Sequence, residues 1–222
     1  MKEFLLGKRK NNSVIRLVLT ATFAALSILV GLLQIPWFPP FNFLKIDFSE
    51  VIILISLLTL GFSNTTIVII LRSVIRELVI PDKLVPFPFF GEFVAIYASL
   101  VLISLYKLVI VLTGKKQPKN ITDGLEPLQK EPLWKILVQD IFVIAGFTVA
   151  LVALNYFFTV PIQMSLTKHF FFVPYIKSIN QSVGTYTLFV LQLIGPFNIV
   201  KGIATFVVFE LTKTGLTQAG IL

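Results

Sequence analysis

The chain has 222 residues, of which 56% are hydrophobic and 14% charged, with a formal net charge of +8. A soluble domain carries about 25% charged residues, so this composition, with a mean hydropathy of +0.90, excludes a water-soluble globular protein. There are no cysteines, which excludes disulfides, thiol nucleophiles and cysteine-ligated metal sites. The apolar runs lack the period-two alternation of barrel strands, so the sequence predicts an all-α membrane protein with one transmembrane domain spanning residues 1–222.

The positive charge is concentrated next to the apolar runs. Basic residues fill positions 8–16, before the first run, and positions 115–135, between two later runs. Loops rich in lysine and arginine stay on the cytoplasmic side of a membrane. This placement predicts a multi-pass protein of the cell membrane, in contact with lipid, and argues against a nucleic-acid-binding face.

The first half of the chain predicts four membrane-spanning helices. Residues 14–35 form a first, retained helix, and the three prolines within 36–40 forbid helix and predict a Pro-rich outer loop. A second helix is expected over residues 47–61, where Asp47 and Glu50 match the capping-box pattern. A tight connection at residues 61–64 leads to a third helix, which ends near residue 80. A fourth helix is expected over residues 92–112.

The second half predicts two more spans. The polar segment 114–133 is expected to be a cytoplasmic linker, followed by a fifth helix over residues 133–160. Residues 183–194 are apolar but reach only about 18 Å as a helix, so segment 174–194 is expected at the outer surface. A sixth helix then starts at Pro196, and both termini are cytoplasmic. The alternative is one helix over 183–212, kinked at Pro196.

Polar residues within or beside the apolar runs gather toward the expected outer half. Polar groups at membrane depth usually face a cavity or a partner, so they predict a shared pocket that opens outward. Asp47 and Glu50 could instead cap a helix, and Arg76 could pair with Glu50 or Glu92; the deeper Arg72 favours an ion pair or a cavity. The set comprises Lys45, Asp47, Glu50, Arg76, Glu77, Glu92, Asn155, Asn198 and Lys201.

No catalytic or nucleotide-hydrolysing motif is recognisable. His169 is the single histidine and has no evident catalytic partner, and the chain lacks the G-x-x-x-x-G-K-[ST] phosphate loop. We therefore do not expect an enzyme, although a membrane-embedded enzyme and a scaffold protein remain alternatives. Ala21 and Ala25 are spaced to let two membrane helices approach closely, either within this chain or with another subunit.

Four segments together resemble a known transporter family. They are the Ala21–Ala25 pair, FLKIDFS at 43–49, LNYF at 154–157 followed by Val160-Pro161, and GPFNIVKG at 195–202. In order and spacing they resemble the substrate-binding S components of energy-coupling factor (ECF) vitamin transporters, above all the riboflavin-specific type. An S component for another vitamin, such as pantothenate or folate, remains the alternative.

The resemblance implies a six-helix bundle that captures riboflavin, as transported substrate and not as cofactor, from outside the cell. It implies docking through Ala21 and Ala25 onto a transmembrane coupling subunit driven by two ATPase subunits. Asn198 offers a donor and an acceptor to the ring edge and Lys201 a further donor, while Phe41 and Phe43 could close a lid. The expected substrate-binding residues are Asn198, Lys201, Asn155, Phe41, Phe43, Leu44, Lys45, Tyr156 and Phe197.

Overall fold

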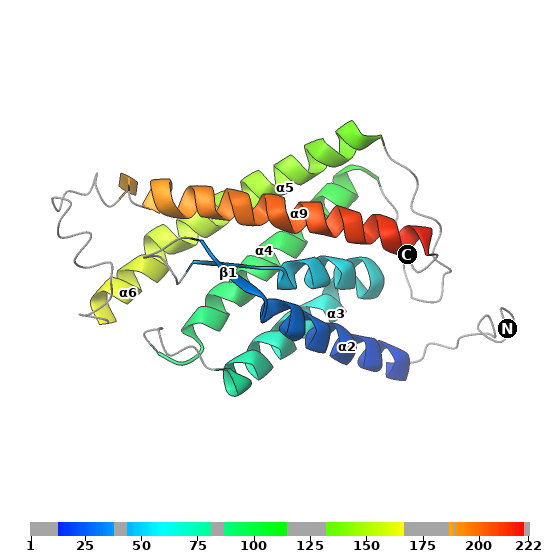
Figure 1. The fold of residues 1–222 in the computed structure, drawn as a ribbon, viewed down its shortest axis with the longest axis horizontal. Coiled ribbons are helices and arrows are strands. Elements are labelled where there is room, and N and C mark those ends of the chain that lie inside the picture. The colour runs from blue at the N-terminus through cyan, green and yellow to red at the C-terminus, as the bar shows by residue number, and fades with distance from the viewer. Residues whose placement is uncertain are drawn as a thin grey trace, which may run out of the picture.

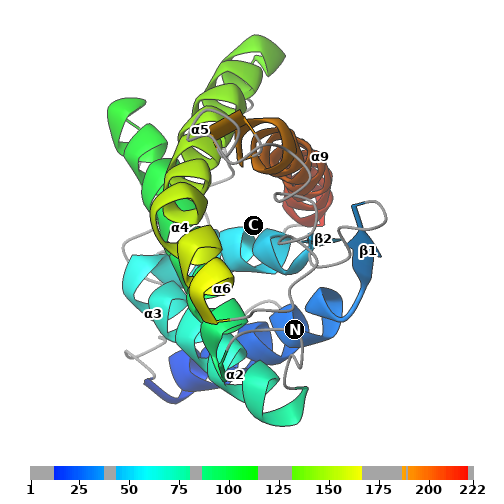
Figure 2. The same ribbon diagram turned by 90° about the vertical axis from the view of Figure 1, so that its left-hand side faces the viewer.

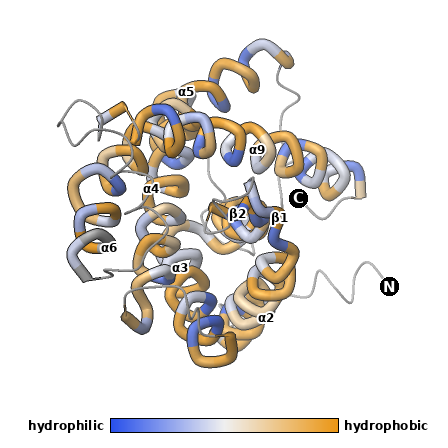
Figure 3. Tube along the Cα trace, turned by 60° about the vertical axis from the view of Figure 1, so that its left-hand side comes forward, coloured by the Kyte–Doolittle hydropathy of each residue, from blue (hydrophilic) through white to orange (hydrophobic). Residues whose placement is uncertain are grey.

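The structure, a computed structural model, describes residues 13–37, 44–80, 87–114, 132–166, 187–188 and 190–219. Within these residues, five helical stretches are long and apolar enough to cross a membrane. Large apolar side chains such as Leu112 and Leu133 are exposed, and hydrophobic residues run along every helix (Figure 3). The membrane class is therefore confirmed. The helices are α2 (Ser13–Gly31), α3 (Ser49–Val79), α4 (Phe90–Leu112), α5 (Leu133–Leu154), α6 (Val160–Leu166) and α9 (Gly195–Gln218).

Helix α3 is folded back on itself at Gly61. This residue has φ +77° and ψ 173°, a conformation outside the helical region that glycine adopts without steric cost. The two halves contact each other: Ser56 donates to Thr65 over 3.2 Å, and Arg72 donates to Ser49 over 3.3 Å. The tight connection expected at residues 61–64 therefore exists.

A small β-hairpin follows α2. Strand β1 (Gln34–Pro36) pairs antiparallel with β2 (Lys45–Asp47), with Ile35 opposite Ile46. The prediction that the first helix reaches residue 35 is wrong, because the chain leaves the helix at Gly31 to make this pairing. Pro36 fits in a two-stranded ribbon, where a missing donor is tolerated. Most of the expected Pro-rich loop, residues 38–43, lies outside the described residues.

Two π-helical segments extend the later spans. Segment η1 (Asn155–Thr159) joins α5 to α6 without a break, so this span runs to residue 166 and not to 160. Segment η2 (Val190–Ile194) runs directly into α9, which ends at Gln218. The prediction that a new helix starts at Pro196 after a separate apolar segment is wrong for residues 190–194. From residue 190 on, the alternative of one helix through Pro196 describes the structure.

The helices pack around one main apolar core built from α2, α3, α4, α5 and α9. Helix α2 begins, and α9 ends, at the same end of the bundle (Figure 1). The β-hairpin, η1 and η2 lie toward the opposite end, and the hairpin lies between α2 and α9 in the end-on view (Figure 2). Residues 115–131 of the expected linker, and residues 174–186 and 189 of the expected surface segment, lie outside the described residues.

Candidate functional site

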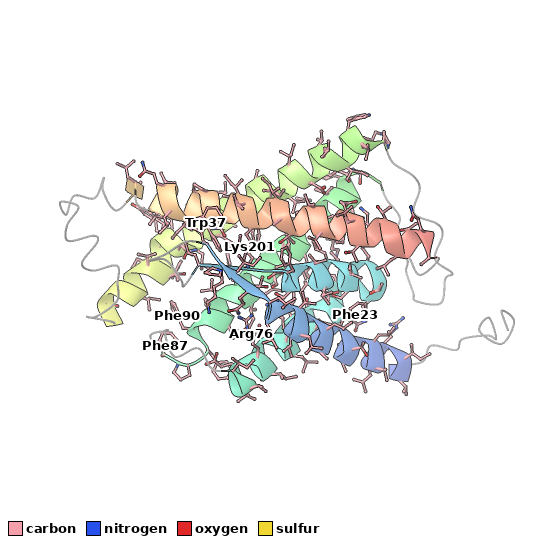
Figure 4. The ribbon with its side chains drawn as sticks, in the orientation of Figure 1. Phe23, Trp37, Arg76, Phe87, Phe90 and Lys201 are labelled. Carbon is pink, nitrogen blue, oxygen red and sulfur yellow. The ribbon has the colours of Figure 1, made fainter. Side chains whose placement is uncertain are left out.

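The β-hairpin packs against the first turns of α9. Lys201 Nζ lies 3.6 Å from Asp47 Oδ2, and both side chains keep some exposure, 14% and 13%. One turn earlier on α9, the ring of Phe197 meets that of Trp37 edge-to-face, with centroids 5.9 Å apart. Trp37 and Lys201 lie at the same end of the molecule (Figure 4). An aromatic contact and a charged contact therefore join the segment after α2 to the helix that carries Lys201.

Asp47 is ionised by its surroundings. Burial raises the pKa of its carboxyl, but the Lys201 ammonium and the Ser49 hydrogen bond, with Arg72 and Arg76, outweigh burial and lower the pKa from 3.8 to about 2. Its Oδ1 accepts the Ser49 backbone N–H over 3.1 Å and also the Ser49 hydroxyl. Asp47 is thus a fixed anion beside Lys201 at neutral pH.

Each of the two π-helices is followed closely by its own proline. Segment η1 ends at Thr159, two residues before Pro161, and η2 ends at Ile194, two residues before Pro196. A proline in a helix lacks a donor and its ring clashes with the carbonyl four residues earlier. Widening the preceding turn relieves that clash. Such π-bulges are frequent at functional sites, and these two lie beside the predicted residues Asn155 and Asn198.

A second, smaller apolar cluster forms where η1 and η2 meet. Its partly buried margin includes the predicted residues Leu44 and Tyr156, and the Tyr156 hydroxyl is 3.2 Å from that of Thr187. The structure therefore brings together three segments that are distant in sequence: the hairpin, the η1 region and the η2–α9 region. The buried members of the cluster are Val160, Val190, Leu193 and Ile194.

Asn155 and Asn198 make the same local contact. In each, the amide nitrogen donates over 2.8 Å to the carbonyl four residues earlier, that of Leu151 or Ile194. Asn198 is buried and Asn155 partly buried. A side-chain amide has a second N–H and an oxygen beyond such a bond, so each residue combines a fixed orientation with further hydrogen-bonding capacity.

Ser99 of α4 joins Glu50 and Arg72 of α3 in a buried polar cluster, and no sequence pattern pointed to Ser99. Arg72 Nη1 lies 3.6 Å from Glu50 Oε1, and Arg72 Nη2 donates to Ser99 over 3.0 Å. Ser99 in turn donates to Glu50 over 2.8 Å. Glu50 therefore does not complete a capping box with Asp47, and that interpretation is wrong. The expected ion pair of Arg72 is confirmed.

The neighbouring charges are paired as well. Arg76 Nε lies 3.3 Å from Glu92 Oε1, one of the two partners expected for it. Glu77 accepts the backbone N–H of Phe89 over 3.0 Å, and Phe89 has a positive φ of 65°. These groups hold the start of α4 against α3. They form the α3–α4 side of the predicted polar set, which Ser49 links through Asp47 to Lys201.

The remaining predicted residues divide as follows. Lys45 is half-buried in β2, opposite Pro36, while Phe41 and Phe43 lie outside the described residues. Ala21 and Ala25 are exposed on α2, whereas Ala24 between them is 2% exposed. Since they face outward, these two alanines do not serve packing inside the described part of the chain.

The sequence profile of one family spans most of the chain. It is described as ECF transporter, substrate-specific component, and it matches residues 15–212. The chain belongs to this family. It is accordingly a multi-pass membrane protein with the role of an S component in an ECF transporter.

Curated relatives over almost the full length are transporters. A riboflavin transporter, RibU, of Streptococcus thermophilus is 27% identical over 199 residues, covering 88% of this chain and 80% of the relative. RibU of Leuconostoc mesenteroides is 28% identical over 194 residues, covering 87% of this chain and 86% of the relative. RibU of Lactococcus lactis subsp. cremoris is 26% identical over 203 residues, covering 90% and 91%.

The fold also matches a solved structure. An S component of a bacterial ECF transporter is similar with a TM-score of 0.62 and 21% identity, covering 93% of this chain and 98% of that one. At this identity the likeness supports the fold alone.

Proposed function

We propose that this S component captures riboflavin from outside the cell for import. The observation that carries the proposal is the convergence of Lys201, Phe197 and Trp37 beside Asn198, on segments that are far apart in sequence. A flavin needs flat apolar walls and a few directed polar groups, the usual design of a small-molecule site. The transporters named RibU among the relatives favour the same substrate.

Each residue has a role in this proposal. Asn198 pairs with the N–H and carbonyl edge of the ring, and Lys201 donates to a ring carbonyl. Asn155 serves the opposite polar edge or the ribityl hydroxyls. Aromatic and apolar side chains surround the ring, and Lys45 lies at its margin. The surrounding residues are Phe197, Tyr156, Leu44, Phe41 and Phe43, of which the last two act as a lid.

Direct binding tests the substrate. Purified protein should be yellow or should quench added riboflavin fluorescence with saturable, one-site behaviour. Pantothenate and folate serve as competitors, since each is the substrate expected for another kind of S component. Failure to bind riboflavin, together with saturable binding of either competitor, would assign the pocket to that vitamin instead.

We also propose six membrane passes with both termini in the cytoplasm. The fold-back at Gly61 supports counting the two halves of α3 as separate passes. Basic residues support the orientation, because several lie near the end of the bundle where α2 begins and α9 ends, as the positive-inside rule requires. They are Arg16, Lys107, Lys135 and Lys213. Cysteine accessibility at the two termini in right-side-out and inverted vesicles would test the orientation.

The exposed alanines of α2 are proposed to dock on the transmembrane coupling subunit, which two ATPase subunits drive. Ala21→Leu or Ala25→Leu should leave riboflavin binding intact and abolish uptake, because a bulky side chain prevents close helix approach. Ala145→Leu, at an exposed alanine of α5, is the matched control and should transport normally. Normal uptake by the alanine variants would move the docking face elsewhere.

A further inference from the structure

A chain of polar contacts leads from the interior of the bundle to Lys201. The Lys201 ammonium meets Asp47 Oδ2 at 3.6 Å. The other carboxylate oxygen, Oδ1, accepts two hydrogen bonds from Ser49, one from the backbone N–H at 3.1 Å and one from the hydroxyl. Ser49 therefore binds one oxygen of the Asp47 carboxylate, and the other oxygen faces Lys201.

Ser49 is itself fixed by a hydrogen bond from Arg72. Its hydroxyl oxygen accepts Arg72 Nη1 over 3.3 Å, so the hydroxyl proton is directed to Asp47. Arg72 is 1% exposed and is fixed at both terminal nitrogens, because Nη2 donates to Ser99 and Nη1 also lies 3.6 Å from Glu50 Oε1, while its buried Nε has no hydrogen-bond partner among the described residues. The last link of the chain is thus anchored by α3 and α4 together.

Lys201 needs such a hold if it is to donate to a ligand. A lysine side chain has about four rotatable bonds and loses considerable rotamer entropy when it is fixed. Within the described residues, Lys201 makes its ion pair with Asp47. Any rotation of the Asp47 carboxylate would redirect the ammonium, and the two bonds from Ser49 oppose that rotation.

We infer that Ser49 and Arg72 are positioning residues for substrate binding, acting through Asp47 on Lys201 without touching the ligand. The inference rests on the proposed function, in which Lys201 contacts riboflavin. It differs from a packing role in one respect: the effect of Ser49 on affinity requires Lys201. Hydrogen-bonded chains of this kind strengthen one another in a low dielectric.

A double-mutant cycle on riboflavin affinity tests this dependence. Ser49→Ala should raise the riboflavin Kd about three- to tenfold in the wild-type chain and less than about twofold in a Lys201→Ala background. Ser49→Thr keeps a hydroxyl and should restore affinity to within about twofold of wild type. Equal losses in the two backgrounds would overturn the inference, because an additive effect means that Ser49 acts independently of Lys201.

Ser27→Ala is the matched structural control. Ser27 is as buried as Ser49, and its hydroxyl donates to the Ser49 backbone carbonyl over 3.3 Å and not to Asp47. It should lower thermal stability without changing the Kd. If Ser49→Ala does not fold, Ser49→Cys, which nearly keeps the side-chain size but donates only weakly, takes its place in the cycle, with the same two expected values and the same contradicting result.

The outcomes separate this inference from the proposed function. If the wild-type chain does not bind riboflavin, both are overturned. If the wild-type chain binds it and Lys201→Ala weakens binding, but the cycle is additive or Ser27→Ala weakens binding as much as Ser49→Ala, then the proposed function stands and only the positioning role is overturned.

Discussion

The Arg72–Glu50 pair and the Lys201–Asp47 pair lie on either side of Ser49, yet their surroundings differ. The first pair is 1% and 3% exposed and is closed by hydrogen bonds from α3 and α4. The second is 14% and 13% exposed and joins a strand to the first turns of α9. A buried pair is costly to break, whereas a partly open one can exchange contacts with a ligand. The first pair therefore maintains the scaffold, whereas the second is the one that we propose takes part in recognition.

Breaking the closed pair should have the largest effect. Glu50→Ala leaves the Arg72 guanidinium buried without its carboxylate, which costs about 3–5 kcal/mol of stability. Thermal unfolding of the purified protein in detergent should show a large drop in midpoint, with riboflavin able to recover part of it by mass action. An unfolding midpoint equal to that of wild type would mean that this pair does not hold the scaffold.

Substitutions near the partly exposed Lys201–Asp47 pair should change riboflavin affinity and not stability. Asn198→Ala and Lys201→Ala should each raise the riboflavin Kd tenfold or more, about 1.4 kcal/mol, because a polar edge of the ring is left buried without a partner. Fluorescence titration measures the Kd. Asn64→Ala is the control, since Asn64 makes the same bond to the carbonyl four residues earlier on the Gly61 side of the bundle. Near-wild-type affinity in both site variants would move the pocket elsewhere.

A smaller effect is expected for the aromatic contact beside the open pair. Trp37→Leu removes the edge-to-face contact with Phe197, worth about 0.5–1.5 kcal/mol, and should speed riboflavin dissociation by a few-fold in stopped-flow measurements. Phe87→Leu removes a similar contact with Phe90, at 5.1 Å, from the loop region before α4. Similar dissociation rates in the two variants would argue against a specific role for Trp37.

The smallest change is expected with pH. The pKa of Asp47 is lowered from 3.8 to about 2, so its contribution to stability is present above the ordinary value and is lost as pH falls toward the lowered one. Between about pH 5 and 8 Asp47 stays ionised, so its charge should not alter the riboflavin Kd across this range, and its share of stability should decline only in stronger acid. A change in riboflavin affinity centred between about pH 5 and 8 that disappears in Asp47→Asn would contradict this assignment.

Hydropathy and proline patterns predicted most of the helices because burial in lipid demands long apolar runs. The β-hairpin was missed because strands of three residues carry no periodicity that could distinguish them from a loop. The capping box was predicted from local spacing, but Glu50 is drawn to Arg72, 22 positions away in the chain, and such a tertiary contact has no local signal. Asn198 and Lys201 stood out both as polar residues beside an apolar run and as part of a motif shared with a known family, whereas Ser49 and Ser99 were missed because buried serines look like ordinary helix residues.

The π-helical segment η1 changes the face that the chain presents. Along α5 the buried positions recur at helical spacing, at Val143, Phe147, Leu151 and Leu154. The next positions on that stripe, Phe157 and Phe158, are instead 67% and 60% exposed, and burial resumes at Thr159 and Val160. One extra residue in the turn rotates everything beyond it by about 100°. Deleting a single residue here would return the span to regular α-helix and turn a different set of side chains toward the proposed site. The length of this segment therefore matters to the proposed binding site as much as its side chains do, and a relative that lacks one residue here would present a different face at this position.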